Sequence, residues 1–419
     1  MYSDCMKTYM TAKEAAEFLG VSRETLYAYV SRGQLQSESA PGLSRERRYL
    51  RADVLELKRR NNVRRDPSIA VEQSLQLGPP ILSSGITLIQ DGRLFYRGRD
   101  VLQLAQNASL EDVAALLWGG DRAVRVSTDR TRRALPQSQR DAKSDDSLTL
   151  EQMQLKLVRG SLHDPSGYDL RATSVQRTGW QILALFRQMV SRWTGASDLH
   201  EVFQSSWVSR DSSAAEIIRA ALVLCADHEL NVSAFAARCT ASAGASPYDV
   251  VLTGLATLKG KRHGGQTEAA AALLSSLTSA KVAKTILYER LRRGEAIPGF
   301  GHPLYPKGDC RASFLLDLLY ARDNTPRTRL IRSLTETGED VLGERPNIDW
   351  ALAAIGQSLA LPTEAPLFLF AVSRTVGWIA HAIEQYESGN LIRPRARYVG
   401  PHPEPTYQVP DKARELGIR

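Results

Sequence analysis

Several features that would place this chain in a special class of protein are scarce or missing. Its 419 residues include only four cysteines, Cys5, Cys225, Cys239 and Cys310, and these are far apart with no CxxC pair. This spacing excludes a disulfide framework and a cysteine-based metal centre. No segment approaches the ~20 consecutive apolar residues that span a bilayer. The first residues show no basic region followed by an apolar one, so we expect no secretory signal and a cytoplasmic location.

The composition is otherwise that of a folded protein. Hydrophobic residues make up 43% of the chain, charged residues 24% and aromatic residues 7%, which excludes wholesale disorder. The net charge is +8, and residues 1–65 hold 13 basic and 8 acidic residues, which gives that part +5. A basic excess in a short segment indicates a polyanionic partner or, alternatively, only a solvated surface.

The sequence pattern divides the chain into three parts. Residues 1–65 have a compact helical pattern, residues 66–80 are typical of a linker, and residues 81–419 are long and helix-rich. Within the last part, residues 121–150 are polar and dense in charge and predict a loop or mobile insertion. Prolines after Pro401 predict an extended arm. The overall fold class that we expect is mainly α-helical.

Two short helices joined by a glycine turn are expected near the start of the chain. Thr11 and Glu14 form a capping box for the first helix, which Gly20 ends. Ser22 caps a second helix, which carries Leu26, Tyr27 and Val30 as its apolar residues and ends at Gly33. A basic segment over 45–51 and a third helix over 52–60 follow. Helix, tight turn and helix form the helix-turn-helix arrangement.

The segment "YMTAKEAAEFLGVSRETLYAYVSRGQL…RRYLRADVLELKRR" resembles the excisionase-type (MerR-like) helix-turn-helix family. The resemblance implies DNA binding, whereas the alternative is a small helical module for protein contacts. Useful affinity would need a dimer, because one copy offers few phosphate contacts. The residues that we expect to meet DNA are Arg23, Thr25, Arg32, Arg45 and Arg48.

The long third part opens with a hairpin signal and continues with helices. A turn at Asp91-Gly92 separates two short apolar runs over 86–96, and Ser109 caps a helix that ends at Gly119. Apolar helices are expected over 212–225 and 248–259, with a further helix beginning near Thr267.

Three of the seven histidines, His228, His263 and His302, stand beside glycine or polar residues at expected helix ends. His263 precedes a helix, whose positive dipole end would keep the imidazole neutral and able to donate to an oxyanion. His302 follows the flexible segment 298–301, where glycines allow close approach of a substrate. His228-Glu229 lacks a third ligand and an HExxH pattern, so we expect no metal.

Further candidates follow these histidines in the chain. Asp349 comes after Asn347, and three arginines, Arg311, Arg374 and Arg393, have no acidic run beside them. Guanidinium groups match carboxylates geometrically, so an anionic substrate with several carboxylates is expected. Each feature alone is more often structural, and only their combination points to a site.

Residues 75–400 together resemble the citrate synthase family. The matching segments are "ALVLCADHELNVSAFAARCTASAGASPYDVVLTGLATLKGKRHGG", "IPGFGHPLYPKGDCRASFLLDLL", "RPNIDWALAAIG" and "AVSRTVGWIAHAIEQYESGNLIRPRARYVGP". The resemblance implies large and small helical domains that close over the substrates, and a homodimer. It also implies an acyltransferase that condenses acetyl-CoA with oxaloacetate and releases citrate and CoA, with no cofactor besides the CoA thioester substrate.

Roles follow from the same resemblance. Asp349 matches the general base, His263 the group that stabilises the enol, and His302 the group that polarises the ketone. Substrate-binding positions are matched by His228, Arg311 and Arg374, and by Arg393, which would reach into the partner subunit's site. Lys307 is a candidate contact for CoA.

Some positions depart from the family pattern, namely Pro303–Pro306, Cys310, and Gln266 with Thr267. They leave the acyl group open between acetyl and propionyl, the latter giving 2-methylcitrate. Two other functions stay open: a DNA-binding regulator that senses acyl-CoA or oxaloacetate, and cleavage in the reverse direction, although no ATP-binding P-loop motif is present.

Overall fold

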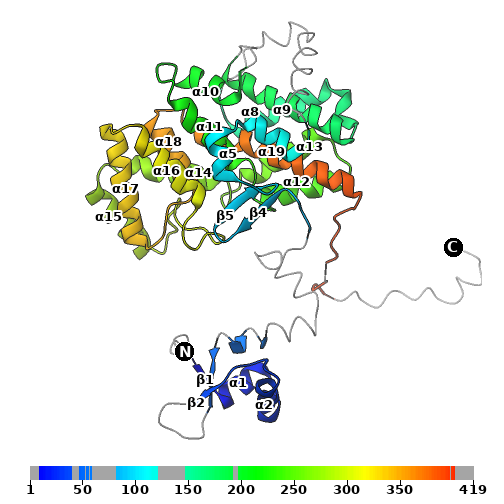
Figure 1. The fold of residues 1–419 in the computed structure, drawn as a ribbon, viewed down its shortest axis with the longest axis vertical. Coiled ribbons are helices and arrows are strands. Elements are labelled where there is room, and N and C mark those ends of the chain that lie inside the picture. Colours follow the sequence, from blue (N-terminus) through cyan, green and yellow to red (C-terminus); the bar gives the residue numbers. More distant parts are fainter. Residues whose placement is uncertain are drawn as a thin grey trace, which may run out of the picture. The chain divides into compact units, whose positions relative to one another are not determined.

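A computed structural model describes residues 9–39, 47–51, 53–55, 57–58, 82–120, 147–191, 197–396 and 398–401. The chain forms two compact units, Met1–Ser84 and Gly85–Arg419 (Figure 1). The predicted linker over 66–80, residues 121–146 of the predicted insertion, the arm after Pro401 and Arg45 lie outside the described residues. The described cysteines, Cys225, Cys239 and Cys310, are free thiols.

The first unit packs two helices against a small antiparallel sheet. Its elements are β1 (Tyr9–Thr11), α1 (Ala12–Leu19), α2 (Arg23–Ser31), β2 (Glu38–Ser39) and β3 (Arg47–Leu50), with strand order β1-β3-β2. The predicted capping box of Thr11 and Glu14 is present, Gly20 ends α1 with a φ of 69°, and Ser22 caps α2. The described residues among 51–58 are helical, as expected.

The apolar face predicted for α2 is wrong at one position. Leu26 is fully buried, but Tyr27 is 50% exposed. A helix turns by about 100° per residue, so Tyr27 lies on the face of Arg23 and Ser31, which are both exposed. The core of this unit is completed instead by Met10, Leu35 and Tyr49 from the strands and loops.

The second unit begins with the predicted hairpin. Strands β4 (Thr87–Gln90), β5 (Arg93–Tyr96) and β6 (Arg99–Asp100) form an antiparallel sheet in that order. Asp91 and Gly92 both have positive φ, of 52° and 75°, which is the geometry that a two-residue hairpin turn requires.

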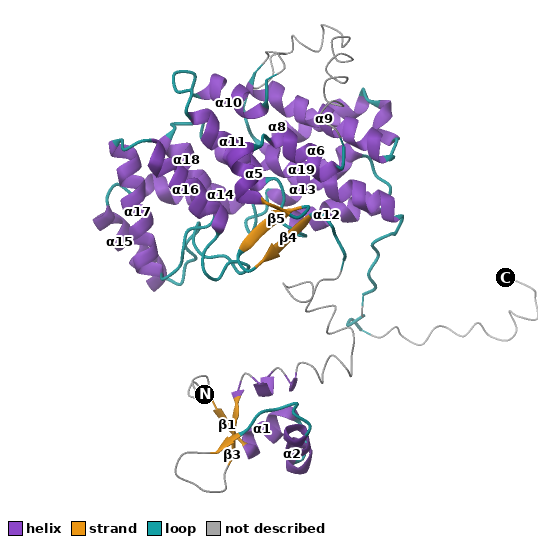
Figure 2. Cartoon of the chain, viewed as in Figure 1, coloured by secondary structure: helices purple, strands orange, loops and turns teal. Residues whose placement is uncertain are grey.

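Helices make up the rest of the second unit (Figure 2). They are α5 (Val101–Asn107), α6 (Leu110–Trp118), α8 (Leu150–Leu162), a short 3-10 turn η2 (Pro165–Tyr168), α9 (Ala172–Val190), α10 (Leu199–Trp207), α11 (Ala214–Cys225), α12 (Val232–Ser242), α13 (Pro247–Leu258), α14 (Gly265–Ser276), α15 (Ala280–Arg292), α16 (Cys310–Arg322), α17 (Pro326–Leu342), α18 (Ile348–Ser358) and α19 (Ala365–Ser388). Ser109 and Gly119 bound α6 as predicted. The insertion predicted over 121–150 overlaps α8 at its last residue, because Thr149 caps α8 and Leu150 begins it.

Helix α19 is the central element of this unit. It contacts α6, α9, α11, α12 and α13, whereas α14 to α18 form a second group that packs mostly on itself. Contrary to the expectation from the sequence, α19 is long and apolar enough to cross a membrane, but its apolar window is entirely buried inside the protein. A helix that is apolar on all sides and surrounded by other helices is a core helix. The two helical groups correspond to the large and small domains that we expected.

Candidate active site

The candidate residues of the second unit come from the ends of helices and from the middle of α19. His228 lies between α11 and α12, His263 between α13 and α14, and His302 between α15 and α16. The other three lie on helices: Arg311 in the first turn of α16, Asp349 in the first turn of α18, and Arg374 inside α19. Electrostatic interactions link all six groups. His228 interacts with His263, His302 and both arginines, and the two arginines also act on Asp349. The fold therefore brings these six residues together.

His228 is buried beside two other rings. Its Nε2 lies 2.9 Å from the hydroxyl of Tyr305, and its ring centroid is 5.2 Å from that of His302. Burial, together with Arg311 and Arg374, holds the pKa of His228 well below its usual value. The imidazole is therefore neutral near pH 7 and can donate only one hydrogen bond.

Buried polar contacts hold the loop that carries His228 in place. Asp227 is fully buried, accepts a hydrogen bond of 2.5 Å from Thr87, and lies 3.3 Å from Nε2 of His381. Burial alone would raise the pKa of Asp227, but His381, Arg374 and Thr87 outweigh it and lower the pKa below its ordinary value. The N–H of Gly377 on α19 donates to Ala226 O at 3.0 Å. These contacts fix His228 relative to α19.

His302 has a defined tautomer when it is neutral. The backbone N–H of Leu304 donates to Nδ1 of His302 at 3.2 Å, so the ring proton belongs on Nε2. Burial and then Arg311 lower the pKa of His302 to about 4. Nε2–H of His302 is thus available to donate to a substrate oxygen.

The segment before His302 is tied to the segment before Asp349. Gly301 N donates to Arg345 O at 2.8 Å, and Asn347 donates through its backbone N to Gly299 O at 2.9 Å. Gly299 has a φ of 92°, and a side chain there would meet Trp350. Glycine is therefore required at position 299, and backbone hydrogen bonds hold the two loops together.

His263 is bonded to a serine from α12. Its Nε2 lies 2.7 Å from Ser233 Oγ, which also accepts a hydrogen bond of 3.2 Å from Trp378 Nε1. Burial and Arg374 lower the pKa of His263 to about 3. The expected neutrality is present, but burial is its largest cause rather than the helix dipole. Ser233 Oγ also lies 2.8 Å from Asn231 Oδ1, which can only accept, so its single proton serves either Asn231 or His263. When Ser233 donates to Nε2 of His263, the ring proton lies on Nδ1 and is available to the site.

The two arginines differ in how their charge is compensated. Arg311 is 2% exposed and donates to Asp309 through Nε at 2.9 Å and Nη2 at 2.8 Å. Arg374 is 1% exposed and donates through Nε to Cys225 O at 2.8 Å. In the described part of the chain, no carboxylate lies within ion-pair distance of Arg374, and its two Nη groups make no hydrogen bond. A buried cation without a partner is a binding site for an anion.

Asp349 is a carboxylate with a raised pKa. Burial raises its pKa to about 6, although a hydrogen bond from Thr267 and the charge of Arg311 act in the opposite direction. Thr267 Oγ1 donates to Oδ1 of Asp349 at 2.5 Å. A carboxylate whose pKa lies near the operating pH is well matched to general-base catalysis.

Two candidates lie apart from this cluster. Lys307 is exposed on the loop before α16, and Arg393 is exposed beyond the end of α19. Neither makes a hydrogen bond or ion pair with another described residue. On the first unit, Arg23 and Arg32 are exposed and Thr25 is half-buried on or next to α2. Arg48 lies 3.1 Å from Glu38 and over the ring of Tyr9, so it is partly engaged within its own sheet.

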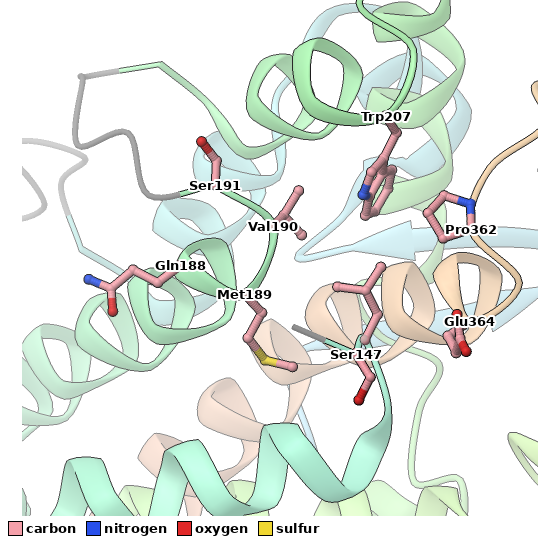
Figure 3. Close-up of a pocket in the computed structure, with 9 residues that line it drawn as sticks. Ser147, Gln188, Met189, Val190, Ser191, Trp207, Pro362 and Glu364 are labelled. Carbon is pink, nitrogen blue, oxygen red and sulfur yellow. The ribbon is translucent and has the colours of Figure 1, made fainter. Parts of the chain in front are cut away.

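Sequence reasoning missed the residues that hold the site, namely Ser233, Thr267, Tyr305, Asp227 and His381. Thr267 and Tyr305 stand only four and three residues after His263 and His302. Their short spacing to the histidines was the available signal. A separate cavity of about 260 Å³ is lined by residues such as Met189, Trp207 and Pro362 (Figure 3). It contains none of the candidate residues.

Comparisons with known proteins find relatives for both units of the chain. Residues 77–395 match the family described as citrate synthase, C-terminal domain, and residues 9–62 match a helix-turn-helix domain. The chain is 28% identical to citrate synthase 2 of Bacillus subtilis (strain 168), over 79% of this chain and 96% of that protein. It is 26% identical to 2-methylcitrate synthase of Shewanella oneidensis, over 76% of this chain and 92% of that protein.

A solved structure gives the same result. Citrate synthase from Thermotoga maritima MSB8 superposes on this chain with a TM-score of 0.65 and 27% identity, covering 80% of this chain and 97% of that one. The extent of the family match, over most of the second unit, decides the assignment. The chain belongs to the citrate synthase family and carries a helix-turn-helix domain at its N-terminal end.

Proposed function

We propose that this chain condenses a short acyl-CoA with oxaloacetate and releases CoA, as an acyltransferase of the citrate synthase type. The observation that carries the proposal is one linked cluster of a carboxylate with a pKa of about 6, neutral imidazoles and the buried guanidinium of Arg374, which has no carboxylate within ion-pair distance among the described residues. Removing a proton next to a thioester needs a base and an oxyanion donor at once. The cluster supplies both.

Oxaloacetate binding is assigned to the two arginines and His228. The free Nη groups of Arg374 would form a fork with one substrate carboxylate. Arg311 keeps its ion pair with Asp309. Its guanidinium also lies over the ring of Tyr305, whose hydroxyl is hydrogen-bonded to His228. The dicarboxylate would thereby supply the carboxylate partner that Arg374 lacks.

The first chemical step is the transfer of a proton from the methyl group of acetyl-CoA to Asp349. Nδ1–H of His263 donates a hydrogen bond to the thioester oxygen, so the product is an enol or enolate stabilised by that hydrogen bond. Because the pKa of His263 lies at about 3, the imidazole acts as a neutral donor and not as an imidazolium.

The second step forms the carbon–carbon bond. The enol carbon attacks the ketone of oxaloacetate, and Nε2–H of His302 donates to the oxygen that becomes an alkoxide. Water then cleaves the thioester and releases citrate and CoA. This scheme uses no metal or cofactor, and independence from both stays a prediction, tested by activity after exhaustive treatment with a chelator.

The acyl group is acetyl or propionyl. Family members of both kinds are similar to this chain, and Pro303–Pro306 and Thr267 depart from the usual pattern next to His302 and Asp349. The test is thiol release by the purified full-length chain with oxaloacetate and either thioester, with the product identified by mass spectrometry. The thioester that reacts faster identifies the acyl group that the enzyme uses. Thiol release that does not require oxaloacetate contradicts the proposal. Lys307 stays a candidate contact for the phosphates of CoA.

A homodimer is the proposed oligomeric state. Leu155, Val158 and Leu162 are exposed on α8 at a spacing that places them on one face, and Arg393 lies on an exposed segment. If Arg393 completes the partner's site, a mixture of Asp349→Asn and Arg393→Ala subunits forms hybrid dimers with one intact site. Such mixtures should regain about a quarter of the wild-type activity. A mixture no more active than its inactive parents contradicts shared sites.

DNA binding is a second proposed function, favoured by the surface of α2. Arg23, Tyr27 and Arg32 are all exposed on or next to this helix, in the unit that matches a helix-turn-helix domain. Binding to duplex DNA should weaken with salt, and Arg23→Ala should lower the slope of log K against log salt by about 1. Lys259→Ala, on the second unit, is the matched control and should leave the slope unchanged. A cytoplasmic location stays a prediction from the sequence.

A further inference from the structure

A threonine outside the predicted set contacts the reactive carboxylate. Thr267 is fully buried in the first turn of α14, and its hydroxyl donates to Oδ1 of Asp349 at 2.5 Å. The two residues are 82 positions apart and are brought together because α14 packs against α18. This contact is specific to the fold and is not a local cap.

The carboxylate of Asp349 is bonded on one side only. The N-terminus of α18 is capped by Asn347, whose Oδ1 accepts from Asp349 N at 3.0 Å, so the Asp349 side chain is not used as a cap. No described residue donates to Oδ2 of Asp349. One oxygen is therefore held, and the other is left to take up a proton.

Thr267 also belongs to the turn that carries His263. Thr267 N donates to Gly264 O at 2.9 Å, and His263 N donates to Gly260 O at 2.9 Å. A side chain at position 264 would come within 2.6 Å of Leu258 O, so this turn has little freedom to rearrange. The same rigid turn thus positions both His263, the oxyanion donor, and Thr267, the hydrogen-bond partner of Asp349.

We propose that Thr267 is a positioning residue of the condensation reaction, whose hydroxyl holds Oδ1 of Asp349 so that Oδ2 faces the acyl group. This inference rests on the proposed function. A second effect follows from the hydrogen bond, because a donor to the ionised carboxylate stabilises the charged form that acts as base.

The charged surroundings of Asp349 do not replace this bond. Arg311 and Asp309 at the start of α16 and Arg374 on α19 act on the carboxylate with opposite signs, and none of them donates a hydrogen bond to it. Without the hydroxyl, burial would lose the largest of the effects that oppose it, and the pKa of Asp349 would rise further. Hydrogen bonds to charged groups contribute about 1.5–3 kcal/mol, which corresponds to about one to two pH units in the pKa of Asp349.

The test compares Thr267→Val, which keeps the shape but removes the hydroxyl, with Thr267→Ser, which keeps the hydroxyl. Thr178→Val is the matched control, since Thr178 is a fully buried helical threonine whose Oγ1 has no hydrogen-bond partner. The readout is kcat/KM for thiol release between pH 5 and 9. In Thr267→Val the acid limb should move up by about one to two pH units. The KM for oxaloacetate should stay unchanged, and Thr267→Ser and Thr178→Val should keep the wild-type limb.

Two results would overturn the inference: an acid limb that does not move in folded Thr267→Val, and a Thr267→Ser variant that behaves like Thr267→Val. Thr267→Ala provides a second variant without the hydroxyl and should show the same shift. If the wild-type chain releases no thiol, the proposed function fails, and the contact is decided by unfolding instead. At pH 8 the effects of Thr267→Val and Asp349→Ala on urea unfolding should then be non-additive, and additive effects overturn the inference.

Discussion

Removal of the Arg374 side-chain charge should weaken substrate binding without the usual loss of stability. Arg374 is buried, and no described carboxylate lies within ion-pair distance of it, so in the free protein the charge of Asp227 offsets its cost of burial only in part and a bound anion would offset more. The substitution Arg374→Gln removes that cost together with the hydrogen bond to Cys225 O. The substitution is therefore expected to weaken the complex with substrate and to relieve a cost of burial in the free protein.

The two magnitudes can be estimated separately. Loss of one partner from a buried charged hydrogen-bonded pair costs about 2–5 kcal/mol, so the Kd for oxaloacetate should rise by about 30-fold to several thousandfold. In the free protein, loss of the bond to Cys225 O costs about 1 kcal/mol. The gain from no longer burying a lone charge is at least of similar size. The free energy of unfolding without ligand should consequently stay equal or increase.

Arg238 is the matched control, because it is also a buried arginine but has partners. It lies 2.7 Å from Glu384 and 2.7 Å from Gln385. Arg238→Gln should destabilise the free protein by about 2 kcal/mol and leave oxaloacetate binding nearly unchanged. Urea unfolding without ligand and calorimetric titration with oxaloacetate measure both quantities. An Arg374→Gln variant that binds oxaloacetate like the wild type, or that loses as much stability as Arg238→Gln, would refute the reasoning.

Three further predictions concern the groups around the substrate. Because Asp349 must be ionised to accept a proton and its pKa is raised to about 6, kcat/KM should rise with pH through about 6 and then level off; a profile flat from pH 5 to 8 would contradict this. Ser233→Ala removes the partner of His263 Nε2 and should lower kcat about tenfold at unchanged KM for oxaloacetate, whereas an unaffected kcat argues against tautomer control. Gly377→Ala would place a Cβ 2.4 Å from an oxygen of the loop that carries His228. It should lower Tm and abolish oxaloacetate binding, and a variant with wild-type Tm would show that the loop is not fixed as described.

Local signals in the sequence predicted the local structure well. The capping box at Thr11, the glycine at position 20 and the Asp91-Gly92 turn each depend on neighbouring residues alone, and all three are present. The assignment of Tyr27 to the apolar side of α2 was wrong, because only tertiary packing decides which of two adjacent apolar residues faces the core. The buried position of α19 also depends on its neighbours, although its composition alone would suit a membrane.

The sequence marked the principal residues of the candidate cluster but not the residues that support them. Glycines and polar residues beside His228, His263 and His302 marked these histidines. By contrast, the pairs Ser233–His263 and Thr267–Asp349 join residues 30 and 82 positions apart, and only the packing of helices brings them into contact. The low pKa of His263 shows the same limit: the sequence suggested a helix dipole, whereas burial, which is a property of the fold, is the larger cause.

The most direct test of the proposed condensation is thiol release by Asp349→Asn beside the wild-type chain, with oxaloacetate and the better thioester. Asparagine keeps the shape of the side chain and a partner for Thr267, but it cannot accept the proton. The wild type should release thiol only with oxaloacetate present, and Asp349→Asn should lower kcat by about 100- to 10,000-fold while binding oxaloacetate normally. Near-normal thiol release by a folded Asp349→Asn variant would contradict the assignment of this carboxylate as the base and, with it, the proposed reaction at this site.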